Sequence, residues 1–111
     1  MIRIDPDGYA TRVEVVLSPN ADERPAGVEV KLLVIHAISL PPGQFGGSGI
    51  VELFTNRLDP LQDPYYAEIA GLRVSAHFLI RRNGVILQFV SCDRRAWHAG
   101  ISSWNGMERC N

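Results

Sequence analysis

The feature that most constrains the fold is an Asn-Gly pair set between two apolar segments. Ser75–Arg82 (SAHFLIRR) and Val85–Val90 (VILQFV) are rich in β-branched and aromatic side chains, and Asn83-Gly84 separates them. Asn-Gly is the preferred central pair of a type I′ turn, whose twist matches that of two antiparallel strands. The sequence therefore predicts a β-hairpin with a two-residue turn at Asn83-Gly84.

A second apolar segment, residues 28–36 (VEVKLLVIH), ends in a histidine. Its first half alternates with charge, and Leu32–Ile35 then runs unbroken between the boundaries set by Gly27 and Pro41. A run of this kind is typical of a central strand buried on both faces. His36 is then expected at the carboxyl edge of a core strand, where open α/β sheets bind their ligands.

Composition limits the class of protein. The chain has 111 residues, 46% of them hydrophobic and 21% charged, with a net charge of −1 and two cysteines. These values favour a single α/β domain over residues 1–111 and exclude a disordered chain, a disulfide framework and general attraction to nucleic acid or anionic membranes. The N-terminal residues contain no apolar signal segment, and no apolar run could span a membrane, so we expect a cytoplasmic protein.

The remaining local patterns are weaker. Residues 12–17 predict a short strand, and the polar, turn-rich residues 18–27 predict an exposed loop. Residues 41–49 (PPGQFGGSG) are expected to form a loop that lines the site of His36, although a plain connector is the alternative. After Cys92 the pattern indicates no further helix or strand.

Two short helices are expected between the Gly-rich loop and the hairpin. Ser48 is expected to cap the first helix, and Asp63-Pro64 has the composition of the start of a second helix that ends near Gly71. The apolar stripe of the first helix consists of Ile50, Leu53 and Phe54.

The three histidines are His36, His77 and His98, and their spacing is too wide for a local metal motif. Helical metal sites use pairs three or four residues apart, so only the fold could bring these side chains together. A hydrogen-bonded structural histidine remains the alternative at each position.

Other chemistry has less support in the residues alone. The serines do not occur in a G-x-S-x-G elbow, and Cys92 reads either as a thiolate nucleophile beside two arginines or as an inert buried thiol. Four arginines lie near Trp97, and they favour a solvated sheet edge, with a small anionic ligand or nucleic acid as alternatives. These arginines are Arg81, Arg82, Arg94 and Arg95.

Three segments together carry a resemblance to a known family. They are LLVIHAISLPPGQFGG, LRVSAHFLIRRNGVILQFV and RRAWHAGISSWNGMERCN, and the resemblance that they carry extends from about Leu32 to Asn111. In this order the segments resemble the zinc-dependent N-acetylmuramoyl-L-alanine amidases, and most closely those that act on 1,6-anhydro-muropeptides. The resemblance implies a mixed central sheet with flanking helices, as in peptidoglycan-recognition proteins. It also implies hydrolysis of the amide between the lactyl group and L-alanine during cell-wall recycling.

The resemblance also assigns roles to residues. His36 matches the first zinc ligand of the family, so the implied cofactor is Zn²⁺. Residues that match substrate-contacting positions are Arg73, Trp97, His98, Ala99 and Arg109. The family usually has Asn after the ligand histidine, and Ala37 here lacks that hydrogen-bond donor.

By the same resemblance, the second zinc histidine, the aspartate ligand and the catalytic glutamate and lysine are expected beyond Asn111. We therefore expect no catalytic residue within this chain and an incomplete domain. A catalytic zinc needs three protein ligands and an open position for water, so one histidine would hold it weakly.

Three interpretations remain open at this point. The chain is part of a zinc amidase, or it is a degenerate module that binds muropeptide without cleaving it, or a second chain supplies the missing part. His98 and Cys110 are candidate substitute ligands, although no sequence pattern supports them.

Overall fold

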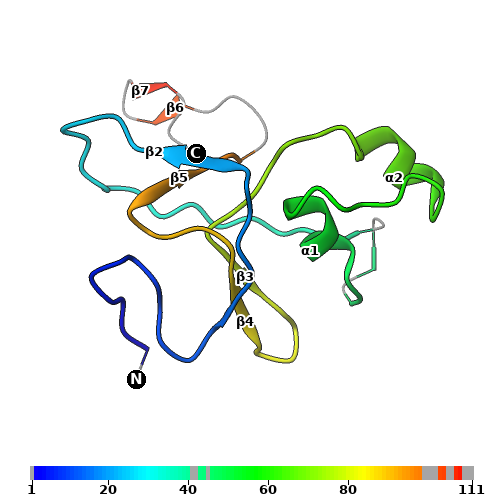
Figure 1. The fold of residues 1–111 in the computed structure, drawn as a ribbon, viewed down its shortest axis with the longest axis horizontal. Helices are drawn as coiled ribbons and strands as arrows, with labels where there is room; N and C mark the ends of the chain where they lie inside the picture. Colours follow the sequence, from blue (N-terminus) through cyan, green and yellow to red (C-terminus); the bar gives the residue numbers. More distant parts are fainter. Residues whose placement is uncertain (1, 41–42, 45, 99–102, 105–106, 109–111) are drawn as a thin grey trace.

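The computed structural model describes residues 2–40, 43–44, 46–98, 103–104 and 107–108. The described residues contain two helices, and their short strands form three separate sheets (Figure 1). In chain order the elements are β1 (Glu14–Val15), β2 (Ala21–Glu23), α1 (Gly49–Phe54), α2 (Pro64–Ile69), β3 (Phe78–Ile80), β4 (Ile86–Gln88), β5 (Arg94–Ala96), β6 (Ser103–Trp104) and β7 (Met107–Glu108). β6 and β7 pair with each other in antiparallel orientation.

The largest sheet has the order β1-β4-β3 and is mixed. β4 runs parallel to β1, with Glu14 opposite Leu87, and antiparallel to β3, with Leu79 opposite Leu87. The predicted hairpin and the predicted strand within residues 12–17 are both confirmed, as is the expected mixed α+β class.

The turn of the hairpin differs from the prediction. Arg81 and Val85 form the last pair, with the Arg81 N–H donating to the Val85 carbonyl at 2.9 Å, so three residues form the loop. Gly84 has a φ of +87°, whereas Asn83 does not have the positive φ that a type I′ turn requires. A three-residue loop places its one left-handed residue last, where glycine fits, and the Asn83 side chain accepts a hydrogen bond from the Val85 N–H at 3.1 Å.

A second sheet forms where the sequence predicted none. β2 and β5 pair in antiparallel orientation, with Ala21 opposite Ala96. The prediction of an exposed loop over residues 18–27 is therefore wrong, since Ser18 and Asn20 are also buried. The prediction of no strand after Cys92 is wrong for the same reason. These strands are short and polar, and their pairing depends on a contact between distant parts of the chain rather than on local pattern.

The core lies between α1 and the end of β4. Phe54 of α1 meets Phe89 edge to face, with ring centroids 5.0 Å apart, and Phe89 is fully buried. Ile50, Leu53 and Phe54 are all buried, which confirms the predicted apolar stripe. Apolar burial on this face stabilises a six-residue helix that would be marginal in isolation.

The two helices begin differently. Asp63 caps α2 as predicted, because its side chain accepts a hydrogen bond from the Tyr65 N–H at 2.8 Å. Ser48 precedes α1 but makes no such cap, and its hydroxyl donates instead to Glu52 Oε1 at 3.0 Å. Among the described residues, neither helix has the length and apolar character needed to cross a lipid bilayer.

The prediction for residues 28–36 is wrong. This segment is not part of a strand, and Leu33 and Ile35 are 82% and 84% exposed. A strand needs neighbours to pair its backbone N–H and C=O groups, and no strand of the described sheets pairs with this segment. His36 is therefore exposed on an irregular segment rather than at the edge of a buried strand.

Candidate functional site

Two buried polar residues hold the backbone at Trp97. The Trp97 N–H donates to the Asn20 carbonyl at 3.2 Å and to the Ser75 hydroxyl at 3.1 Å. The Ser75 N–H donates in return to the Trp97 carbonyl at 2.8 Å. Asn20 and Ser75 are each only 1% exposed, so these hydrogen bonds are shielded from water. They fix the chain immediately before His98.

Asn20 is itself fixed by its side-chain amide. Its Nδ2 lies 2.8 Å from Asn56 Oδ1, 2.8 Å from the Val74 carbonyl and 3.3 Å from the Phe54 carbonyl. Sequence reasoning missed both Asn20 and Ser75. An asparagine in a polar, turn-rich stretch gives no local sign that it will be buried, because the burial depends on partners distant in sequence.

His36 and His98 lie against each other. Their ring centroids are 4.0 Å apart and the ring planes are inclined by 34°. His36 is exposed and His98 is half-buried. The fold thus brings together two of the residues assigned to the site, one from an irregular segment and one from the segment anchored by Asn20 and Ser75.

Of the other residues assigned to the site, two lie within the described part of the chain and two lie outside it. Arg73 is exposed and lies two residues before Ser75, and Trp97 is 37% exposed. The hydrogen bonds between Ser75 and Trp97 place these two residues on neighbouring stretches of chain. Ala99 and Arg109 lie outside the described residues, and the substrate-contacting roles of all these residues stay predictions.

The described residues do not complete a catalytic metal centre. None of them form a group of three or more His, Cys, Asp or Glu side chains able to hold an ion. A catalytic zinc uses three protein ligands, so the described part of the chain offers His36 with His98 beside it and falls short of a full set. Cys110, the other candidate ligand, lies outside the described residues.

His77 is a structural histidine. Its Nε2 lies 2.8 Å from the Arg94 carbonyl and 3.4 Å from Arg24 Nη2. Because a carbonyl only accepts, Nε2 carries the proton and donates to Arg94. Burial lowers the pKa of His77, the nearby Arg24 lowers it further, and the bond to Arg94 opposes both. The alternative of a hydrogen-bonded histidine is confirmed at this position.

Cys92 does not have the environment of a nucleophile. Burial raises the pKa of its thiol, and Asp93 raises it further, while Arg24 acts in the opposite direction. A reactive cysteine needs a lowered pKa, so the inert thiol is the better interpretation.

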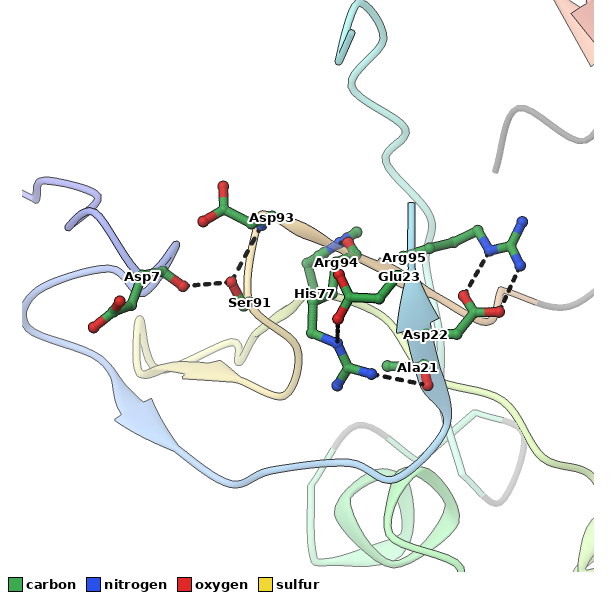
Figure 2. Close-up of polar contacts among 9 residues, drawn as sticks. All are labelled: Asp7, Ala21, Asp22, Glu23, His77, Ser91, Asp93, Arg94 and Arg95. Atoms are coloured by element: carbon green, nitrogen blue, oxygen red, sulfur yellow. Dashed lines mark hydrogen bonds and ion pairs between the residues drawn. The ribbon is translucent and has the colours of Figure 1, made fainter. Parts of the chain in front are cut away.

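Acidic partners offset two of the four clustered arginines (Figure 2). Arg95 donates to both carboxylate oxygens of Asp22, and Arg94 Nε lies 3.4 Å from Glu23 Oε1. Asp22 and Arg95 face each other in the β2–β5 register, and this contact lowers the pKa of the Asp22 carboxyl. The surface is therefore of mixed charge, which does not favour nucleic acid as a ligand.

The Gly-rich loop contributes to two shallow hollows. One is lined by Gly46, Gly47 and the hairpin turn, where Arg81 Nη1 donates to the Gly47 carbonyl at 3.0 Å. The other lies between Gln44 and the start of α2. Neither hollow is lined by His36 or His98, so the role of the loop beside His36 stays a prediction.

Comparisons with known proteins find relatives that match almost the whole of this chain. The chain is 56% identical over 105 residues to the 1,6-anhydro-N-acetylmuramyl-L-alanine amidase AmpD of Citrobacter freundii, a match that covers 95% of this chain and 56% of that protein. It is 56% identical over 104 residues to the protein of the same name in Escherichia coli, covering 94% of this chain and 57% of the relative. The chain thus spans a little more than half the length of these curated relatives.

Two solved structures of related proteins also match this chain. A crystal structure of a selenomethionine derivative of AmpD, 55% identical, matches 97% of this chain and 60% of its own with a TM-score of 0.92. The solution structure of Citrobacter freundii AmpD, 54% identical, covers 98% of this chain and 58% of its own with a TM-score of 0.61. The comparisons give no support for a second chain. The N-acetylmuramoyl-L-alanine amidase family matches residues 26–110, and this chain belongs to that family.

Proposed function

We propose that this chain is part of a zinc-dependent amidase that hydrolyses the lactyl–L-alanine amide of 1,6-anhydro-muropeptides during peptidoglycan recycling in the cytoplasm. The observation that carries the proposal is the contact between His36 and His98, whose ring centroids are 4.0 Å apart. It joins the two most specific motifs of the chain at one place. The identity of 56% to relatives that bear this activity in their names supports the substrate class.

His36 is the residue that would hold zinc. A complete ligand set that includes His36 would hold zinc, which would supply a Lewis acid for the scissile carbonyl and a source of hydroxide near neutral pH. The remaining ligands are not among the described residues, so we expect the chain by itself to bind substrate without turning it over.

The residues of this chain would bind and orient the substrate. Arg73 is exposed, and its guanidinium can donate paired hydrogen bonds to a carboxylate or to sugar oxygens. Trp97 is partly exposed and offers an apolar face to a sugar ring, and the bonds from Asn20 and Ser75 hold its backbone in place. Holding the substrate in one orientation contributes to catalysis even when the reacting groups lie elsewhere.

A second candidate function is a muropeptide-binding module without activity. The observation that favours it is the lack of a three-ligand group among the described residues, while Arg73 and Trp97 remain accessible. Binding that persists after zinc is removed with a chelator would select this function.

The experiment compares this chain with a chimera that adds the unmatched part of the Citrobacter freundii relative. Binding of a 1,6-anhydro-muropeptide is measured by calorimetry, and release of the stem peptide is followed by chromatography. We expect the chain to bind without turnover and the chimera to hydrolyse. Arg73→Ala should weaken binding in both, whereas Arg57→Ala, an exposed arginine of a different segment, should not. Failure of the folded chimera to hydrolyse and of the chain to bind would overturn both candidate functions.

A further inference from the structure

We propose that Ser75 is a positioning residue for substrate binding, because its buried hydroxyl sets the distance between the chain segments that carry Arg73 and Trp97. Both of these residues are exposed, and both are expected to contact substrate. Ser75 is not among the residues that the resemblance assigns to the site. The inference rests on the proposed function, since it gives Ser75 a part in the binding expected of Arg73 and Trp97.

The Ser75 hydroxyl bridges two segments that are distant in sequence. Its Oγ donates to the Asn20 carbonyl at 2.6 Å and accepts from the Trp97 N–H at 3.1 Å. A hydroxyl has one hydrogen to donate and two lone pairs to accept with, so it can make both bonds at once. Ser75 is only 1% exposed, so water does not compete for either bond.

Backbone groups complete the bridge on both sides. The Ser75 N–H donates to the Trp97 carbonyl at 2.8 Å, and the Val74 carbonyl accepts from Asn20 Nδ2 at 2.8 Å. Arg73 therefore extends from backbone that is held at the next two residues, and Trp97 extends from backbone held at its own N–H and carbonyl. The spacing between these two exposed side chains depends on Ser75 and Asn20.

Removal of the hydroxyl should loosen this spacing without unfolding the chain. In Ser75→Ala, the Trp97 N–H retains the Asn20 carbonyl at 3.2 Å as an acceptor, so neither group is left unpaired. The two segments nevertheless lose the side chain that joins them. A ligand that contacts both Arg73 and Trp97 must then align them again, at a cost in conformational entropy.

Ser91 offers a matched control (Figure 2). It is 5% exposed, and its Oγ donates to the Asp7 carbonyl at 2.5 Å and accepts from the Asp93 N–H at 3.2 Å. Ser91 is thus also a buried hydroxyl between two backbone groups, but neither of its partners is assigned to substrate. Ser91→Ala therefore measures the general effect of losing such a hydroxyl.

The test compares the original chain with Ser75→Ala and Ser91→Ala in the binding of a 1,6-anhydro-muropeptide, measured by calorimetry. Circular dichroism confirms that each variant is folded. We expect Ser75→Ala to weaken binding about tenfold, since a misplacement of about 1 Å can cost a positioned site about 100-fold. Ser91→Ala should bind as the original chain does.

The chimera separates binding from the chemical step. There, Ser75→Ala should raise KM by a similar factor and change kcat little. This pattern is expected when the lost interaction is shared by the bound substrate and the transition state. A fall in kcat with an unchanged KM would overturn the assignment of Ser75 to binding.

Hydrogen exchange at the Trp97 amide gives a readout that needs no substrate. Exchange should be faster in Ser75→Ala than in the original chain and unchanged in Ser91→Ala, because only the first change loosens the backbone at Trp97. Unchanged exchange in Ser75→Ala would overturn the proposal.

The proposal and the proposed function can be told apart when they fail. If the original chain binds muropeptide and folded Ser75→Ala binds it equally well, or if Ser91→Ala weakens binding as much, only the role of Ser75 is overturned. If neither the original chain nor the folded chimera binds, the proposed function fails, and the role of Ser75 in substrate binding fails with it.

Discussion

Asn20 and Asn56 exchange hydrogen bonds between their side chains. Asn20 Nδ2 donates to Asn56 Oδ1 at 2.8 Å, and Asn56 Nδ2 donates to Asn20 Oδ1 at 3.0 Å. Asn56 follows α1 with a φ of +60°, in the left-handed region. The pair ties the end of the helix to the start of β2, and through the carbonyl of Asn20 to the backbone of Trp97.

Replacement of Asn20 should destabilise the fold. Asn20→Ala leaves the Val74 carbonyl without its buried side-chain donor, whereas the Phe54 carbonyl still accepts from the Ser18 hydroxyl. A buried group that loses its partner costs about 1–3 kcal/mol, so the midpoint of urea unfolding should shift to lower concentration. The control is Gln62→Ala at an exposed position. Equal midpoints for the two variants would contradict the role given to Asn20.

Gln88 should hold the N-terminal segment to the sheet. It is fully buried, its Oε1 accepts from the Ala10 N–H at 2.8 Å, and its Nε2 donates to the Gly8 carbonyl at 2.9 Å. Gln88→Leu removes both bonds and leaves the Ala10 N–H without its buried acceptor, which costs about 1–3 kcal/mol, whereas the Gly8 carbonyl keeps the Cys92 N–H. We expect faster proteolysis within residues 5–11, and mass spectrometry of the cleavage products measures the rate. Gln44→Leu, at an exposed position, is the control, and an unchanged cleavage rate at Gln88→Leu would refute this attachment.

Stability should fall at mildly acidic pH because of His77. The folded state lowers its pKa below the ordinary value of 6.5, mainly through burial. The unfolded chain therefore binds the proton more readily, and stability is lost as the pH falls from 6.5 through the lowered value. Urea unfolding at several pH values should show this slope.

His77→Gln should flatten the slope, since glutamine can still donate to the Arg94 carbonyl but does not titrate. His36→Ala retains His77 and should keep the slope. A slope that persists unchanged in His77→Gln would assign the pH dependence to other groups.

Leu33 and Ile35 should contribute little to the stability of this chain. They are 82% and 84% exposed, so Leu33→Ser with Ile35→Ser removes few apolar contacts. We expect an unchanged unfolding midpoint together with weaker binding of the dye ANS and less light scattering, because exposed apolar chains promote association. Leu87→Ser, at a position only 4% exposed, should instead be strongly destabilising. A large loss of stability in the Leu33 and Ile35 variant would show that the segment is packed.

Local chemistry made part of the fold predictable. The hairpin around Gly84 and the cap at Asp63 follow from residues close in sequence, and the structure confirms both elements. The strand expected at residues 28–36 failed because a strand depends on partners, which a local pattern cannot supply. The β2–β5 pair was missed for the converse reason, since its residues are polar and its partners are distant.

The candidate site was also only partly predictable from local sequence. His36 could be assigned only through the resemblance, because a lone histidine after an apolar run is compatible with several roles. Its contact with His98 depends on the anchoring of Trp97 by Asn20 and Ser75, which no spacing of residues reveals.

The most direct test of the account is the zinc content of the folded chain, measured by elemental analysis after equilibration with Zn²⁺ and removal of the unbound ion. The account predicts well under one equivalent for this chain, since the described residues hold no group of three ligands and a catalytic zinc needs three. It predicts about one equivalent for the chimera with the Citrobacter freundii relative, and loss of that zinc when the chimera carries His36→Ala. About one retained equivalent in this chain, or no zinc in the folded chimera, would contradict the account.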